Sequence, residues 1–188
     1  KSGLMIYEKG TESTVECYQC HIVIPTEVFN MIKFREITEE EIPEVSELYT
    51  KLLLYIQSET KDEYFVFNNL SDINLINKLK DDMADRSRRI FIAVENKKII
   101  GFIAGEIIGC FLPISKIKKV GYISGAYVDD EYRNKGIMKK LEKMITIFFK
   151  EHDLEFAELN VISNNFIGKK SWDKLGYNTF REQMRKKL

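Results

Sequence analysis

The chain has 188 residues, of which 44% are hydrophobic and 31% charged, so it is long enough for one globular domain with a sizeable core and hardly for two. No apolar run approaches the roughly 20 residues that span a bilayer, and an odd number of cysteines, three, argues against a disulfide framework. With a formal net charge of zero and no visible secretory signal, we expect a cytoplasmic protein without a membrane anchor.

The first 30 residues fit poorly with the rest of the chain. We interpret residues 1–30 as an N-terminal extension, either the remnant of an added leader or an extra strand or hairpin. Residues 17–21 match the C-x-x-C-H pattern of c-type haem attachment, but neither export nor a distal ligand is signalled. A zinc site would need two more ligands, and only Cys110 and His152 remain. The pattern therefore predicts inert thiols in an edge strand, and no metal.

The next part of the chain reads as one strand followed by two helices. Residues 31–37 alternate as a strand, and Thr38 with Glu41 forms a capping box that opens the first helix. A looser stretch at 57–69 separates it from the second helix, at about 71–85. Apolar residues at helical spacing mark the inward faces: Ile42, Val45, Leu48, Tyr49 and Leu52 in the first helix, and Ile73, Ile76, Leu79 and Met83 in the second.

The second half of the chain alternates strands with helices. A tight turn at 96–98 joins two strands into a hairpin, and a basic loop at 113–119 leads into the central strand. The order β-α-α-β-β-β-α-β-α-β predicts an α/β fold, a central mixed sheet with helices on both faces. The elements we expect are strands at 89–95, 99–111 and 121–128, a helix from Gly136 to Glu151, a strand at 155–162, a helix at 163–174 with Gly176 as its C-cap, and a last strand at 177–187.

The turn after the central strand has the composition of an anion site. The strand ends at Val128, and a charged loop with one glycine, Gly136, leads into an amphipathic helix. The first amides of a helix have no internal partners and carry partial positive charge, and glycine lets a ligand approach the backbone. Arg133 and Lys135 add positive charge. The turn therefore predicts a site for a phosphate or pyrophosphate.

Two motifs resemble the GNAT superfamily of N-acetyltransferases. The pattern V-x-x-x-Y-R-x-K-G-I from Val128 to Ile137 is similar to that family's pyrophosphate loop, R/Q-x-x-G-x-G/A, with Met138 where Gly or Ala is usual. The block from Asn165 to Tyr177 resembles N-x-x-A-x-x-x-Y-x-x-x-G-F, with Gly168 for the alanine and Trp172 for the tyrosine. The element order also matches, so the resemblance covers residues 31–188 and implies a GNAT-like acetyltransferase domain.

The resemblance implies acetyl-CoA as co-substrate, without a metal. In the family the pantetheine arm pairs with the central strand like an added strand, and Gly125 is placed for a bulge that would splay this strand from the next. The N–H of Val128 is the implied donor to the thioester oxygen. The implied cofactor-binding residues are Ala126, Tyr127 and Val128 for pantetheine, Arg133, Asn134, Lys135, Gly136, Ile137 and Met138 for the pyrophosphate, and Asn165 for the pantetheine arm.

The family's direct transfer, in which a neutral amine attacks the thioester, also needs proton transfers. Trp172 cannot protonate the leaving thiolate as the family tyrosine often does. Either the thiolate leaves unassisted, since a thiol pKa lies near ~8.5, or Tyr127 or Tyr177 substitutes, or CoA is bound without efficient turnover. For the general base we consider Glu106 and Tyr122, and also Ser124, Asp129 or a water chain to solvent. Our catalytic candidates are Glu106, Tyr122 and Tyr127.

The charge distribution bears on the acceptor. Residues 36–85 are acid-rich and the chain after Tyr132 is base-rich, which suits a cationic acceptor and a phosphate-bearing cofactor respectively. We therefore expect a small-molecule or peptide amine, read by residues 38–88 and 112–119. A CoA-binding or regulatory module with weak or no catalysis is the alternative. Nucleic-acid binding through the late lysines is disfavoured because few aromatic residues interleave them. A monomer and a homodimer both stay open.

Overall fold

The computed structural model describes residues 6–9, 12–17, 22–25, 31–67 and 72–188. Within the first 30 residues, β1 (Ile6–Lys9), β2 (Glu12–Cys17) and β3 (Ile22–Pro25) form a three-stranded antiparallel sheet of their own. The C-x-x-C-H pattern falls largely on residues 18–21, which lie outside the described residues.

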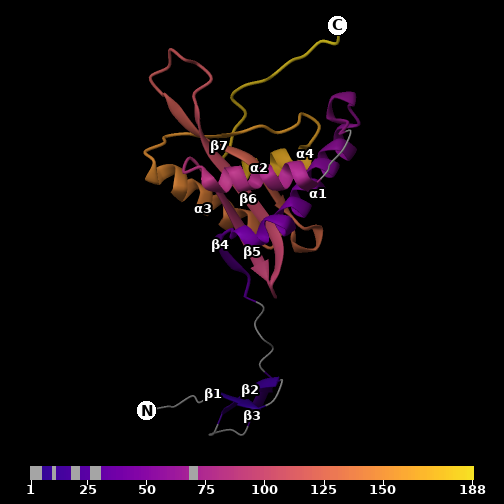
Figure 1. The fold of residues 1–188 in the computed structure, drawn as a ribbon, viewed down its shortest axis with the longest axis vertical. Coiled ribbons are helices and arrows are strands. Elements are labelled where there is room, and N and C mark those ends of the chain that lie inside the picture. Colours follow the sequence, from indigo (N-terminus) through magenta and orange to yellow (C-terminus); the bar gives the residue numbers. More distant parts are fainter. Residues whose placement is uncertain (1–5, 10–11, 18–21, 26–30, 68–71) are drawn as a thin grey trace.

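The main sheet has five strands in sequence order, β4 (Lys33–Glu36), β5 (Arg88–Glu95), β6 (Lys98–Gly109), β7 (Lys119–Val128) and β8 (Ala157–Leu159). Neighbouring strands are antiparallel except for β7 and β8, which are parallel (Figure 1). A parallel pair needs a crossover connection, and the helix between these two strands supplies it. The predicted hairpin and the predicted mixed sheet are thereby confirmed.

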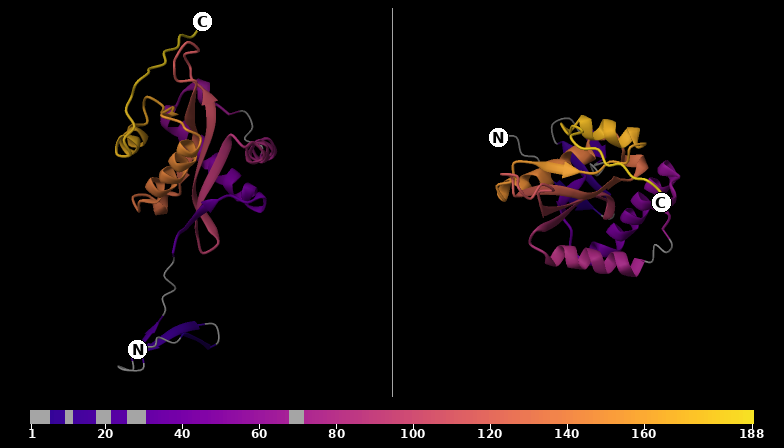
Figure 2. Two further views of the ribbon diagram at one scale, coloured as in Figure 1. Left: turned by 90° about the vertical axis from the view of Figure 1, so that its left-hand side faces the viewer. Right: turned by 90° about the horizontal axis from the view of Figure 1, so that it is seen from above.

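In the part of the chain that the structure describes, four α-helices cover the two faces of this sheet. They are α1 (Ile42–Thr60), α2 (Asp72–Ala84), α3 (Ile137–Glu151) and α4 (Phe166–Asp173). Figure 2 shows α1 and α2 on one face and α3 and α4 on the other. The predicted capping box is present at the 3-10 turn that precedes α1, where the N–H of Thr38 donates to the carboxylate of Glu41 over 3.0 Å.

The sheet separates two hydrophobic cores. Alternate residues of β5 point to opposite faces, so Ile90, Ile92 and Val94 pack with α1 and α2, whereas Ala93 packs with α3. Helix α3 supplies half of the second core with one apolar stripe at helical spacing. The stripe consists of Ile137, Leu141, Ile145, Phe148 and Phe149.

Two glycines let α3 approach the sheet closely. A Cβ atom added at Gly105 or at Gly121 would come within 3.0 Å of the Phe149 ring, a separation that real Cβ atoms essentially never show. The ring thus lies directly against the backbone of β6 and β7. Glycine is used here for close approach, because neither residue has a positive φ.

The end of the chain differs from the prediction. Residues 177–188 form no strand, and the predicted strand at 155–162 is only three residues long, Ala157–Leu159. A strand needs a partner ladder, and so short an edge strand offers little of one. The tail instead makes side-chain contacts, with Arg181 over the Phe111 ring at 4.5 Å and Lys187 at 2.7 Å from Glu63. Helix α1 is also longer than the apolar stripe to Leu52 indicates.

Candidate active site

The central feature of the site is an open edge on β7. Its ladder with β8 covers only Gly121–Ile123, paired with Ala157–Leu159. From Ser124 to Val128, β7 has no strand partner on that side among the residues that the structure describes, although β6 pairs with it along the other side. Unpaired N–H and C=O groups of a strand edge can accept an added extended ligand.

A β-bulge begins at the same point. Ala104 of β6 pairs with Gly125 and Gly105 pairs with Ile123, so Ser124 is the extra residue of β7. The sequence favours Gly125 for the bulge, and it lies one residue earlier. A bulge bends its strand and increases the local twist, which accounts for the divergence of β7 from β8.

Tyr49 of α1 packs against this bulge. It stacks 4.4 Å from the Phe102 ring, and a Cβ at Gly125 would come within 3.0 Å of its hydroxyl. Burial raises the pKa of Tyr49, and a hydrogen bond with Ser124 acts in the opposite direction. The buried phenol therefore stays protonated, and Gly125 is needed to make room for it.

The loop after β7 has the backbone of an anion-binding turn. Asn134 and Gly136 both adopt left-handed conformations, with φ of 63° and 76°, and α3 begins at Ile137. Ile137 is buried and fixes the start of the helix. Met138, which departs from the family pattern, packs against the α3-side core. Since its backbone N–H belongs to the first helical turn, it remains available to a ligand.

Arg133 lies beside this loop and makes several contacts. Its Nε donates to the carbonyl of Val128 over 3.2 Å, and its Nη2 lies 2.6 Å from Asp130. The guanidinium also lies over two aromatic rings, 5.5 Å from the centre of Tyr127 and 5.6 Å from that of Tyr55. Arg133 is thus held at the end of the open edge, beside the turn that would receive phosphates.

Asn165 lies at the N-terminus of α4, close to Tyr55 of α1. It caps α4, where its Oδ1 accepts from the N–H of Gly168 over 2.8 Å. A Cβ at Gly168 would come within 3.0 Å of the Asn165 side chain, so the cap packs closely on the first turn of α4. The hydroxyl of Tyr55 lies 3.5 Å from the same Oδ1, at the long limit of a hydrogen bond.

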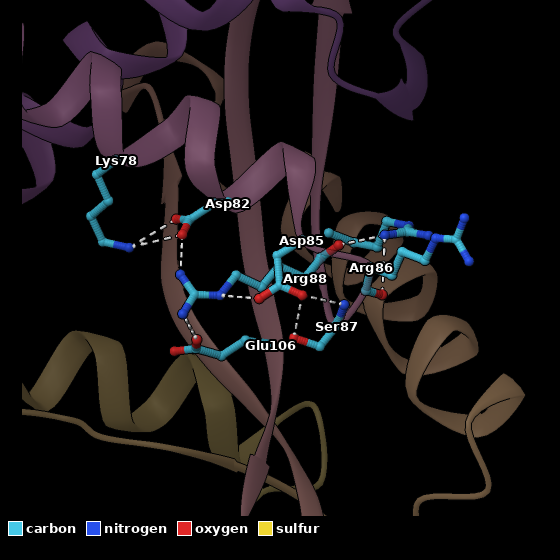
Figure 3. A network of polar contacts seen from close by, with 8 residues as sticks. Lys78, Asp82, Asp85, Arg86, Ser87, Arg88 and Glu106 are labelled. Carbon is cyan, nitrogen blue, oxygen red and sulfur yellow. Dashed lines mark hydrogen bonds and ion pairs between the residues drawn. The ribbon is translucent and has the colours of Figure 1, made fainter.

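Glu106 belongs to a network of charges at the far end of the sheet (Figure 3). It lies 3.1 Å from Arg88, which also pairs with the buried Asp82 of α2. Lys78 pairs with Asp82 at 2.8 Å. This network joins α2 to β5 and β6. Glu106 therefore forms an ion pair with Arg88. This argues against its acting as a free general base.

Tyr122 faces Glu106 across the β6–β7 ladder, and its hydroxyl accepts from Asn160 over 3.0 Å. Burial raises the pKa of Tyr122. Tyr127 is paired with Phe102, and burial raises its pKa as well, while Arg133 opposes the rise. In a regular strand two residues five positions apart face opposite sides. The bulge at Ser124 brings Tyr122 and Tyr127 to the same face.

Other candidates are occupied elsewhere. Trp172 packs edge-on against Tyr177, with ring centres 5.3 Å apart, and the hydroxyl of Tyr177 contacts Glu142 of α3 at 3.2 Å. Asp129 is buried and pairs with Lys51 at 2.8 Å and with Lys98 at 3.4 Å. It therefore ties α1 to the end of β7.

The structure thus forms two groups of the predicted residues. One gathers Tyr127, Arg133 and Asn165 around the open edge, and the other places Glu106 beside Tyr122. Sequence reasoning missed Tyr55 and Arg88. Tyr55 continues the apolar spacing of α1, three residues after Leu52, and extending that stripe could have found it. No pattern in the sequence marks Arg88, because its partners Asp82 and Glu106 lie on α2 and β6.

The described residues offer neither a cluster of metal ligands nor a membrane-spanning helix. No cluster of three or more His, Cys, Asp or Glu side chains in the described part of the chain could hold a metal ion. Within the same residues, none of the helices combines the length and the apolar character that crossing a bilayer requires.

Known structures share this fold. A mutant of the BH1408 protein of Bacillus halodurans superposes with a TM-score of 0.73 at 23% identity, covering 83% of this chain and 99% of that one. A predicted acetyltransferase from Clostridium acetobutylicum, solved with acetyl-CoA, gives 0.68 at 21%, covering 84% and 97%. The aminoglycoside 6'-N-acetyltransferase AAC(6')-Ih of Acinetobacter baumannii gives 0.68 at 16%, covering 84% and 98%.

The sequence itself decides the family. No curated protein matches it. The family model of the GNAT acetyltransferases, however, matches residues 44–177, well over half of the chain. That span includes the bulged strand, the loop at Gly136 and the Asn165 cap, so the residues that carry the resemblance lie within the match. The protein therefore belongs to the GNAT family of acetyltransferases, as its motifs predicted.

Proposed function

We propose that residues 31–188 form a domain that transfers the acetyl group of acetyl-CoA to an amine by direct attack. One observation carries this proposal, namely that the unpaired edge of β7 leads into the left-handed turn at Gly136 and the N-terminus of α3. An extended ligand that ends in a diphosphate fits both parts, because the edge offers backbone pairing and the turn offers amides.

The residues of the open edge would hold the cofactor. Backbone groups of Ala126, Tyr127 and Val128 would pair with the pantetheine arm, and Asn165 would contact it from α4. The amides from Arg133 to Met138, through Asn134, Lys135, Gly136 and Ile137, would receive the pyrophosphate. The Gly136 position supports this assignment, since nothing lies within 4 Å of the place where its Cβ would be.

In the reaction, the amine nitrogen forms a bond to the thioester carbonyl carbon and the carbon–sulfur bond breaks. The proton lost by the nitrogen passes to solvent, and the thiolate of CoA takes up another. Acetyl-CoA supplies the activated acyl group. The chain supplies the donor N–H of Val128, and Tyr122 and Tyr127 face the same side of β7. Tyr127 is the better candidate to protonate the thiolate, because its hydroxyl makes only a long contact of 3.4 Å with the exposed Asp130, whereas that of Tyr177 is engaged with Glu142 at 3.2 Å.

For the acceptor we propose a cationic amine. Glu106 lies opposite Tyr122, and it belongs to a network in which three carboxylates, Asp82, Asp85 and Glu106, share the two cations Arg88 and Lys78, so an excess of negative charge remains there. Several similar structures are named as aminoglycoside N-acetyltransferases, so polycationic amines are the first class to screen. Basic peptides form the second class.

The cofactor site can be tested by calorimetric titration of acetyl-CoA. Gly136→Trp should abolish the saturable micromolar binding that we expect of the wild type. The matched control is Gly176→Trp, since Gly176 also has a positive φ of 92° and open space around it, but lies at the end of α4. Equal loss in both variants, or no binding by the wild type, would refute the assignment.

The alternative is a CoA-binding module with weak or no catalysis. The packing of Trp172 against Tyr177 favours it, because this leaves no family-like acid at that position. Release of free CoA thiol in the presence of an amine panel distinguishes the two functions. Tight acetyl-CoA binding without amine-dependent thiol release would support the binding module.

A further inference from the structure

Helix α1 continues past the sheet and reaches the candidate cofactor site. Near its middle, Tyr49 packs on the bulge of β7, and Lys51 pairs with Asp129 just beyond the end of that strand. Further along, Tyr55 meets Arg133 of the loop and Asn165, the N-cap of α4, and the same Arg133 also lies over the ring of Tyr127 in β7. All three are residues to which we assign cofactor contacts.

The rings of Tyr55 and Tyr127 both flank the guanidinium of Arg133, at 5.6 Å and 5.5 Å. Arg133 also pairs with Asp130, whose side chain is 74% exposed. An ion pair with so exposed a carboxylate is weak and easily exchanged for a phosphate. The two rings would keep the guanidinium in place during that exchange, because stacking on an aromatic face restricts a planar cation.

We propose that Tyr55 is a positioning residue of the acyl-CoA site. Its ring holds Arg133 for the pyrophosphate, and its hydroxyl meets Asn165 at the start of α4. This inference rests on the proposed function. The ring acts through Arg133 on the diphosphate half of the cofactor, and the hydroxyl acts through Asn165 on the pantetheine half. The two contacts can therefore be separated by substitution.

The test is a double-mutant cycle on the full chain, read as the Kd of acetyl-CoA by calorimetry. Tyr55→Leu should weaken binding about five- to tenfold, and Tyr55→Phe, which keeps the ring, about two- to threefold. In an Arg133→Ala background, Tyr55→Leu should cost less than about threefold, because its main partner is gone. Tyr64→Leu, an exposed tyrosine just beyond the same helix, is the control and should bind like the wild type.

A second ligand distinguishes the effect of the Tyr55 ring, through Arg133, from that of its hydroxyl, through Asn165. Acetyl-pantetheine lacks the diphosphate, so Tyr55→Leu should weaken its binding no more than Tyr55→Phe does. Circular dichroism checks that each variant is folded. A folded Tyr55→Leu with the wild-type Kd, or its full effect persisting in the Arg133→Ala background, would overturn the inference while leaving the proposed function intact. Absence of acetyl-CoA binding by the wild type would instead overturn the proposed function, and this inference with it.

Discussion

Gly125 shows how one residue constrains the geometry of the site. It follows the bulge at Ser124, and the hydroxyl of Tyr49 occupies the space that a side chain would need. Tyr49 is almost fully buried and also stacks on Phe102, so it has little freedom to move away. Close packing on the α1 side thus fixes the backbone where β7 leaves β8.

This packing predicts that Gly125→Ala destabilises the protein. Overpacking of a core costs typically about 1–3 kcal/mol, so we expect a loss of about 2 kcal/mol in urea denaturation. Gly109→Ala is the control, because nothing lies within 4 Å of its Cβ position, and it should change stability by less than about 0.5 kcal/mol. If the two variants unfolded at the same urea concentration, Tyr49 would not be confining Gly125.

The site residues differ in how well the sequence predicts them. Arg133, Gly136 and Asn165 could be proposed from the sequence because the loop and the helix cap are local features of consecutive residues. Tyr55 and Arg88 were missed because their roles depend on residues far away in the sequence, as the contact of Tyr55 with Asn165 shows. Glu106 was found as a carboxylate, but its pairing with Arg88 required the structure.

Among the elements, β7 has one edge that is paired and one that is partly open. The β6 side is paired from Lys119 to Val128 except at the bulge residue Ser124, whereas the β8 side is paired only over Gly121–Ile123. Amides that lack a partner exchange with solvent much faster than those in a ladder. The open segment Ser124–Val128 should therefore report ligand binding directly.

Hydrogen exchange measured by mass spectrometry tests this. Saturating acetyl-CoA should slow exchange in peptides covering residues 124–138 by about tenfold or more, because the added ligand pairs with the edge and with the loop amides. Peptides from β5, which is enclosed by β4 and β6, are the internal control and should not change. Protection confined to 133–138 would show that the pyrophosphate binds but the pantetheine does not pair with β7.

The elements that were predicted well have a strongly periodic pattern of apolar residues. The poorly predicted elements are strands that lack a neighbouring strand to pair with. Helix α3 carries five buried residues at helical spacing and was predicted over its whole length. The tail at 177–187 has residues that suit a strand, but a strand depends on the neighbour that it pairs with. Because β8 spans only Ala157–Leu159, propensity alone gave the wrong answer.

At the scale of the whole molecule, two cores share one sheet, and ionisable groups on both sides of it set the pH range of stability. Arg35 holds the pKa of Glu41 down at about 2, through a hydrogen-bonded pair between β4 and the turn before α1. Burial raises the pKa of Tyr49 between α1 and β7, and that of Tyr177 beside α3. The lowered pKa of Glu41 therefore affects stability at acid pH, and the raised pKa values of the two tyrosines affect it at alkaline pH.

The signs of the two effects predict the shape of the stability profile. Glu41 has a lowered pKa in the folded state, so its contribution is present above about pH 4.5 and is lost as the pH falls towards about 2. The buried tyrosines have raised pKa values, so stability falls as the pH rises above ~10, where the unfolded chain ionises. The urea midpoint of unfolding should therefore change little between about pH 4.5 and ~10. Glu41→Gln should reduce the loss of unfolding free energy at acid pH by up to about 1 kcal/mol.

The control for the acid limb is Glu39→Gln, in the same turn, since Glu39 makes no ion pair among the described residues. An acid limb that is unchanged by Glu41→Gln would mean that other carboxylates carry it. On the alkaline side, Tyr49→Phe should delay the loss of stability to higher pH, because the phenylalanine cannot ionise.

The contact of Phe149 with Gly105 and Gly121 has a consequence for how such sequences can diverge. A Cβ at Gly121 would overlap the Phe149 ring, and one at Gly105 would overlap both Ile145 and that ring, so these positions cannot change independently. A relative with alanine in place of Gly121 should carry a smaller residue than phenylalanine at position 149, and one that keeps the aromatic ring should keep both glycines. The path of substitutions through this part of the protein therefore has an order, in which the ring shrinks first.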